Sequence, residues 1–306
     1  MRVTFNAFPD TLLGRLQSLG SEQNKALTQL STGQRLAAPS DDAPAMQRIL
    51  NLRTEKKQNQ QFHRNATDGL EKSKVTFSSL EQIKDLLVRA SELAAGVNGA
   101  SSPTEYFAKS SEINQLIEQG LNVGNTKLRG SYLFAADSPE NPAFTATRDS
   151  QNKITAITYA GSLNDSPIRI GEDTEIKVGS SFPENEKIAI VLNKLIALRN
   201  AMDAPASATK SDTVIGMRGQ GTDNLDQLEN DILSSISRAG TIQYRLETAM
   251  KDLETRYEAT EQLISKDADI DFAEATVRLN RAQMAYQAAI QSGAMIQSNS
   301  LLDYIR

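Results

Sequence analysis

Three aspartates alternate with other residues at Asp267, Asp269 and Asp271, and this spacing resembles the start of a calcium-binding loop. Such a loop also requires Gly at its sixth position and Glu at its twelfth. This chain has Phe272 and Arg278 at those positions. The carboxylates fit the start of a helix better, because the helix dipole favours negative charge there. We therefore expect no metal ion at these residues.

The remaining candidates for chemistry are equally weak. Asp41 and Asp42 have no His or third carboxylate near them in the sequence, so we expect them to cap a helix. His63 is the only histidine, and a lone His without Cys supports neither a His-dependent triad nor a multi-His metal site. The glycine-rich residues 216–221 lack the Lys-Ser/Thr ending of a phosphate-binding loop. The sequence thus predicts no catalytic residue, no metal, no cofactor and no enzyme.

The amino-acid composition excludes further classes of function. The 306 residues are enough for two or three domains, and the net charge of −5 gives no reason to bind nucleic acid or an anionic membrane. There is no Cys, which excludes disulfides and thiolate metal sites. No stretch is apolar enough for membrane insertion or for the core of a signal peptide. We therefore expect any export to use a route without a cleaved signal.

The two ends of the chain have the apolar spacing of helices that pack on other helices. In residues 10–32 and 272–305, apolar or small residues recur every three or four positions, which predicts two helices. Because many of these residues are small and bury little area, we expect the stripes to contact other copies. An ordinary core within one chain is the alternative. The predicted assembly positions are Leu12, Leu16, Leu19, Leu30, Leu279, Ala282, Tyr286, Ala289, Ile296, Leu301 and Leu302.

A hinge is predicted between the first helix and the next. Gly33 is a typical residue after a helix C-terminus. Ser40, Asp41 and Asp42 offer side-chain oxygens to the free N–H groups of the following helix, and Pro44 suits its first turn. That helix is expected over residues 45–96, roughly 75 Å long. Further helices are expected over 104–125, 184–202 and 225–266, with a loop over 203–222.

Short alternating segments separate these helices. Residues 131–134, 153–159, 168–170 and 175–178 are bounded by turn residues and predict a small β domain of four or five strands. The predicted fold is mainly α with a small β insertion, and its long helices come from both halves of the chain. We expect three domains: residues 1–44 with 267–306, residues 45–130 with 183–266, and residues 131–182.

Three segments carry a resemblance to a known family. Residues 30–36 (LSTGQRL), followed by 39–42 (PSDD), resemble the N-terminal signature of bacterial flagellins and their relatives. Residues 271–275 (DFAEA) and 300–305 (SLLDYI) resemble the C-terminal signature. Residues 124–135 (GNTKLRGSYLFA) and the Leu-Leu-Asp-Tyr ending resemble the branch of the family that joins hook to filament rather than filament flagellin.

This resemblance implies a structural subunit of the bacterial flagellum. Relatives are exported unfolded through the flagellar type III apparatus and assemble in a ring between an adjacent hook-associated protein and flagellin. Their terminal helices are disordered in the free monomer, and an export chaperone binds the C-terminal helix. By that likeness the terminal stripes would carry assembly by coupled folding. A filament flagellin, or more remotely a cytosolic coiled-coil scaffold, remains an alternative.

Overall fold

The computed structural model describes residues 7–98, 100–136, 140–164, 167–205, 210–219 and 224–304. Its helices are α1 (Ala7–Thr32), α2 (Ala43–Ala95), α3 (Pro103–Gly124), α4 (Phe182–Asp203), α5 (Lys210–Gly219), α6 (Leu225–Ala268) and α7 (Phe272–Tyr304). Its strands are β1 (Lys127–Leu128), β2 (Ser131–Tyr132), β3 (Phe144–Arg148), β4 (Ile154–Tyr159), β5 (Pro167–Arg169) and β6 (Glu175–Lys177). The predicted fold class, mainly α with a small antiparallel insertion, is confirmed.

Three local predictions need correction. The loop expected over residues 203–222 contains α5, whose Val214 is fully buried because the helix packs on α4. Tertiary packing here outweighs a composition rich in Ala, Ser, Thr and Gly. The segments proposed as strands also omitted β3, which pairs with β4 in an antiparallel hairpin with Phe144 opposite Tyr159. The prediction of four or five strands is also corrected, because the described residues contain six strands, which form three two-stranded sheets.

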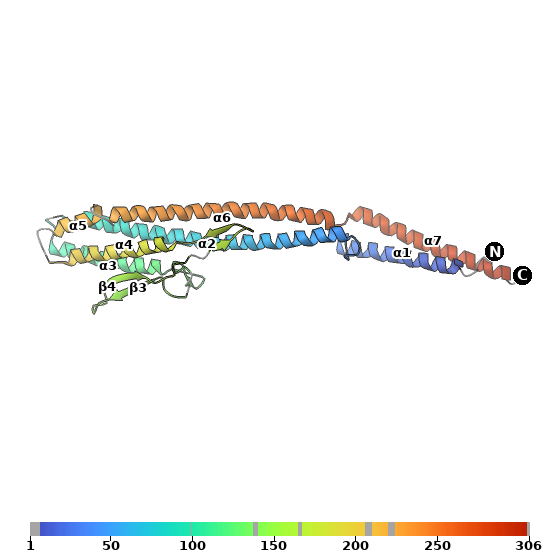
Figure 1. Ribbon diagram of the computed structural model, residues 1–306, viewed down its shortest axis with the longest axis horizontal. Helices are drawn as coiled ribbons and strands as arrows, with labels where there is room; N and C mark the ends of the chain where they lie inside the picture. Colours follow the sequence, from blue (N-terminus) through green and yellow to red (C-terminus); the bar gives the residue numbers. More distant parts are fainter. Residues whose placement is uncertain are drawn as a thin grey trace. The chain divides into compact units, whose positions relative to one another are not determined.

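The chain divides into two compact units, residues 1–58 with 255–306 and residues 59–254. In the first unit, α1 packs along α7, and Figure 1 draws them side by side in dark blue and red. The first turns of α2 face the last turns of α6 through the ion pairs Arg48–Asp267, at 3.0 Å, and Lys56–Glu261. The predicted division into three domains stays a prediction.

The second unit has its core between helices. The apolar stripe of α6 is buried at Leu225, Leu228, Ile232 and Leu246, as its heptad spacing indicates. Where α6 meets α2, the Ser73 hydroxyl donates to the Ala239 carbonyl oxygen at 3.2 Å. Helices α3 and α4 complete this core, and β3 and β4 lie beside them in Figure 1.

Asparagine side chains fasten the β3–β4 hairpin to the helices of the second unit. Asn125, which caps the C-terminus of α3, accepts from the Phe144 backbone N–H at 3.0 Å and donates to the Phe144 carbonyl at 2.9 Å. Asn193 of α4 makes the same pair of bonds with Ile157 at 3.0 and 2.7 Å. Each amide satisfies both polar groups of one strand residue, so the hairpin keeps its backbone paired where it packs against helices.

Candidate assembly site

The terminal helices α1 and α7 pack antiparallel against each other in the first unit. Gly293 lies against Leu12, Gly20 against Tyr286, and Gly33 against Phe272, so positions advancing along one helix meet positions retreating along the other. At Gly293 the approach is close: a Cβ atom placed there would lie 2.6 Å from Cδ2 of Leu12. The missing side chain therefore lets the leucine pack directly on the α7 backbone.

The structure brings most of the predicted assembly residues together in this seam between α1 and α7. Ala282 is buried, and half-buried are Leu12, Leu16, Leu19, Leu30, Leu279, Tyr286 and Ala289. Ile296, Leu301 and Leu302 belong to α7, but their side chains lie outside the described residues. The seam is thus a contact within one chain, and a role for it in contact between copies stays a prediction.

The seam buries little apolar area for its length. Among the seam side chains that the structure describes, the buried apolar residues are the alanines Ala26, Ala275 and Ala282, whereas the leucines are half-buried. Full burial of a leucine contributes about 1.5–3 kcal/mol, and an alanine methyl contributes much less. Ordering the backbone costs roughly 1–2 kcal/mol per residue. The pair of helices therefore gains little stability from the seam alone.

A second apolar stripe lies on the opposite side of α7. Val277, Met284, Ala288 and Met295 are exposed, although three of them are large and apolar. At 100° per residue they point about 180–220° away from the seam residue Ala275. The 7-4-7 spacing of these positions was a signal in the sequence. It was not used, because the 3-4 spacing of the seam residues is stronger and the assembly residues were predicted on that face. A helix with two apolar sides is typical of one that is covered on both.

The connection that follows α1 and the connection that precedes α7 are hydrogen-bonded to each other. Gly33 ends α1 with a φ of +69°, a conformation that glycine adopts without strain. Gln34 and Asp269 then pair as an antiparallel bridge. The Arg35 backbone N–H donates to the Ala268 carbonyl at 2.7 Å, and the Ile270 N–H donates to the Gly33 carbonyl at 3.0 Å. We call residues 33–42 and 268–271 the paired hinge.

Arginines cover the end of α6 at the paired hinge. The Arg35 guanidinium donates to the Asp267 carbonyl oxygen through Nε at 3.2 Å and Nη2 at 2.8 Å, which satisfies a carbonyl that has no partner in the last turn of its helix. Arg48 donates to the Asp267 carboxylate at 3.0 Å. This hydrogen bond, with the charge of the guanidinium, lowers the pKa of Asp267. The positive charges of Arg35 and Arg48 are thus attracted to the negative end of the helix dipole at the C-terminus of α6.

The structure places the predicted cap residues in different roles. Asp42 accepts from the Ala45 backbone N–H at 3.1 Å, as an N-cap of α2 does, and Pro44 lies in the first turn. Asp41 instead holds the hinge, because its Oδ2 accepts from the N–H groups of Ala37 and Ala38 at 3.0 and 3.1 Å. Ser40 is exposed in the turn.

The three alternating aspartates have separate partners. Asp271 caps α7 by accepting from the backbone N–H groups of Ala273 and Glu274 at 2.9 and 3.2 Å. Asp269 accepts from the Ser265 hydroxyl, and Asp267 pairs with Arg48. Within the described residues, no group of three metal-ligating side chains comes together. In the same part of the chain, no helix combines the length and apolarity that a membrane span needs.

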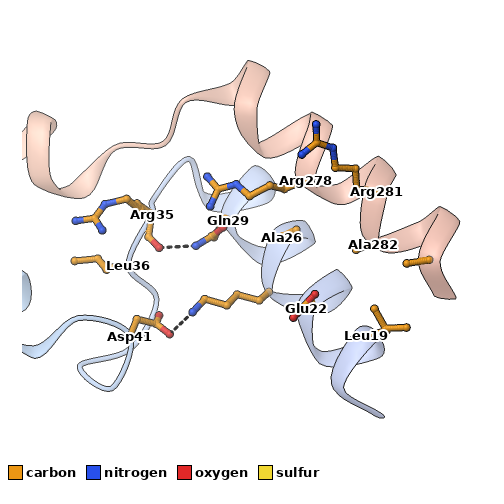
Figure 2. A pocket seen from close by; sticks show the side chains of 12 residues that line it. Leu19, Glu22, Ala26, Gln29, Arg35, Leu36, Asp41, Arg278, Arg281 and Ala282 are labelled. Atoms are coloured by element: carbon orange, nitrogen blue, oxygen red, sulfur yellow. Dashed lines mark hydrogen bonds and ion pairs between the residues drawn. The ribbon is translucent and has the colours of Figure 1, made fainter. Parts of the chain in front are cut away.

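A groove of about 570 Å³ lies between α1, the paired hinge and α7. Figure 2 shows its apolar floor, with Ala26 on α1 and Ala282 on α7, and the charged side chains around it. Two dashed bonds in this view stabilise the turn: Lys25 to Asp41 at 2.8 Å, and the Gln29 amide to the Arg35 carbonyl at 2.6 Å. Lys25 and Gln29 of α1 therefore hold the hinge against this helix.

The stability contributed by Asp41 should depend on pH. The Lys25 hydrogen bond, followed by the two backbone N–H groups, lowers the pKa of Asp41 from 3.8 to about 2 in the folded chain. A carboxyl with a lowered pKa stabilises the fold above its unfolded pKa, and this contribution is lost as the pH falls towards the folded pKa. The side chain is 18% exposed, so salt screens the ion pair only partly.

We therefore expect Asp41→Asn to lower the melting temperature above about pH 4, and the difference to shrink as the pH falls through about 2. The measurement is the thermal unfolding of the variant and of the unchanged protein across this pH range, monitored by circular dichroism. A melting-temperature difference that is constant with pH would show that the charge of Asp41 does not hold the hinge.

Comparison with known proteins places these features in a family. The model of the bacterial flagellin N-terminal helical region matches residues 6–138, and that of the C-terminal helical region matches residues 222–305. The chain is 23% identical over 297 residues to flagellar hook-associated protein 3 of Escherichia coli K12, covering 89% of this chain and 90% of that protein. It is also 23% identical over 313 residues to flagellin of Bacillus subtilis, with both chains fully covered.

The fold agrees with this assignment. The crystal structure of FlgL from Xanthomonas campestris superposes with a TM-score of 0.59 at 13% identity, covering 68% of this chain and 97% of that one. The two family models match the two ends of the chain in the order of a flagellin and together span more than half of it. Flagellins are structural subunits without enzymatic activity. The chain therefore belongs to the bacterial flagellin family and has the fold of the solved FlgL proteins.

Proposed function

We propose that this chain is a structural subunit of the bacterial flagellum that joins the hook to the filament. The observation that carries this proposal is the segment 124–135, which resembles the junction-forming branch of the family. It begins at the C-terminus of α3, forms the β1–β2 hairpin and includes Asn125, whose amide holds β3. The similarity to hook-associated protein 3 and the FlgL fold support the same function.

Assembly is proposed to proceed through the terminal helices. The seam between α1 and α7 buries mainly alanines, so the pair gains most of its stability when other copies cover it. The stripe of Val277, Met284, Ala288 and Met295 provides the apolar face for that contact. The partners are further copies in a ring, an adjacent hook-associated protein on one side and flagellin on the other.

Export is proposed to follow the family route. The chain passes unfolded through the flagellar type III apparatus without a cleaved signal peptide, and it functions outside the cell. A chaperone covers the C-terminal helix beforehand. The two apolar sides of α7 supply the physical reason, because an uncovered apolar face of this kind promotes premature association.

Deletion of the gene and localisation of the product test the junction role. We expect the deleted strain to build hooks without filaments and to release flagellin into the medium, with motility restored by the gene on a plasmid. Antibody labelling should place the protein in a narrow band between hook and filament.

The alternatives predict other results. For a filament flagellin, label would extend along the filament and the purified chain would grow long filaments on short seeds. For a scaffold, the protein would be found only inside cells. The similar identity to Bacillus subtilis flagellin makes the first alternative the one to exclude.

A further inference from the structure

Arg199 is a cation buried in the interior of the second unit. It lies in the last two turns of α4, and the residue is only 3% exposed. Its guanidinium donates to Oδ1 of Asn114 on α3 at 2.8 Å, and to Oδ1 of Asn200 at 3.2 Å through Nε and 2.8 Å through Nη2. Both acceptors are neutral amides. Within the part of the chain that the structure describes, no carboxylate forms an ion pair with this guanidinium.

The absence of a counter-ion in the described residues sets Arg199 apart from other arginines of the chain. Those that form ion pairs lie at the surface, with side chains 33–63% exposed. The acidic residue of α4 that is nearest in sequence, Asp203, pairs with Lys153 at 3.2 Å instead. Ion pairs therefore stand where water already solvates the charge, while the buried guanidinium has none in the described chain.

The burial of Arg199 costs free energy that its surroundings return only in part. A guanidinium keeps its charge at every pH at which proteins fold, so the group cannot escape the cost by losing a proton. Its three hydrogen bonds use three of five N–H donors. The negative end of the α4 dipole attracts the charge, but such an interaction is weak beside the loss of hydration.

An apolar side chain would suit this position better than the charge does. The neighbouring residues Leu195, Leu198 and Met202 of α4 are buried. If the guanidinium were absent, its two acceptors would not be left dry, because Asn114 is half-buried and Asn200 is exposed. Replacing a buried charge by an apolar group of similar volume is often stabilising under these conditions.

We infer that Arg199 is a built-in weak point of the second unit, which keeps the free chain easy to unfold for export. The inference rests on the proposed function, in which the chain passes unfolded through the export apparatus. A lower stability of the free chain does not weaken the final assembly, because partners that bind only the folded state add to its stability. The arginine thus acts before assembly, on the chain inside the cell.

The first test is the stability of the purified full-length chain with Arg199→Met, which keeps the length of the side chain and removes its charge. We expect the melting temperature to rise by about 2–4 °C and unfolding in guanidinium chloride to slow on the order of tenfold. Circular dichroism measures the first effect, and stopped-flow mixing measures the second.

The matched control is Arg245→Met. Arg245 is exposed on α6, so the same substitution removes a charge that water solvates. We expect the melting temperature and the unfolding rate of this variant to equal those of the unchanged chain.

The second test is the rate of export from a flagellated host, followed by pulse labelling and separation of cells from medium and sheared flagella. We expect Arg199→Met to leave the cell several times more slowly, and Arg245→Met to leave at the normal rate. Adding Ile188→Val, which shortens a fully buried side chain of α4, should speed unfolding of the Arg199→Met chain and restore its export.

Three results would overturn the inference while the proposed function stands. Arg199→Met could prove no more stable than the unchanged chain, or it could be stabilised and still leave the cell at the normal rate. Slow export that Ile188→Val does not restore would show that the arginine itself, rather than stability, matters for export. Retention of the unchanged chain inside the cell would instead contradict the proposed function, and the inference with it.

Discussion

Replacing Met284 by Asp should abolish assembly while leaving the body of the protein folded. Met284 lies in the middle of the outward stripe of α7 and is 62% exposed, so a carboxylate is well hydrated there in the free chain. In the assembled state the same carboxylate would be buried against an apolar neighbour. At about 2 kcal/mol or more per contact, binding to hook fragments that carry the adjacent hook-associated protein should weaken by roughly thirtyfold or more. Co-sedimentation and swimming motility measure the two effects.

The control for this variant is Gln287→Asp. Gln287 is exposed on the same helix, about 120° from the seam residue Ala275 and about 60–100° from the outward stripe. It adds the same charge and the same small loss of helix propensity. We expect it to assemble normally. Equal loss of assembly in both variants would mean that α7 tolerates no added charge, and normal assembly of Met284→Asp would exclude the outward stripe as a contact.

Replacing Ala282 by Leu should separate the two terminal helices. Ala282 is buried in the seam and contributes to the floor of the groove beside Ala26. Leucine adds three carbon atoms to a side chain that is only 7% exposed between α7 and α1, and overpacking of this kind costs about 1–3 kcal/mol. Because the seam alone stabilises the pair only weakly, this cost should exceed what the pair gains. We expect faster proteolysis of both ends and loss of assembly, with residues 59–254 still resistant.

Ala273→Leu is the matched control, since it makes the same substitution at an exposed alanine of α7 that does not line the groove. Limited proteolysis followed by fragment masses should show unchanged protection of the ends in this variant. If Ala282→Leu is protected equally well, the α1–α7 seam does not hold the ends together.

Much of the architecture followed from local patterns in the sequence. The heptad stripe of residues 225–263 predicted a long buried face, and Leu228, Ile232 and Leu246 are buried in that face. Helix boundaries were predicted because caps act locally: Asp42 begins α2 and Gly33 ends α1 through bonds to residues a few positions away. The absence of a catalytic constellation was also predicted, from one His and no Cys.

Other features depend on residues far apart in the chain. The spacing of apolar residues showed that α1 and α7 each have a packing stripe, but it does not identify the helix against which a stripe packs. Only the tertiary structure placed Leu12 on Gly293, and so assigned the seam to a contact within the chain. That assignment leaves the opposite face of α7, with Met284 and Met295, as the exposed apolar surface.

The paired hinge illustrates the same limit. The sequence by itself determined that both ends turn at residues 33–42 and 267–271, because Gly, Pro and Asp act on their own backbone. It did not determine that Arg35 would satisfy the carbonyl of Asp267, 232 positions later. Local steric and capping forces are encoded in a few neighbouring residues, whereas such a bond exists only once the intervening chain has folded back on itself.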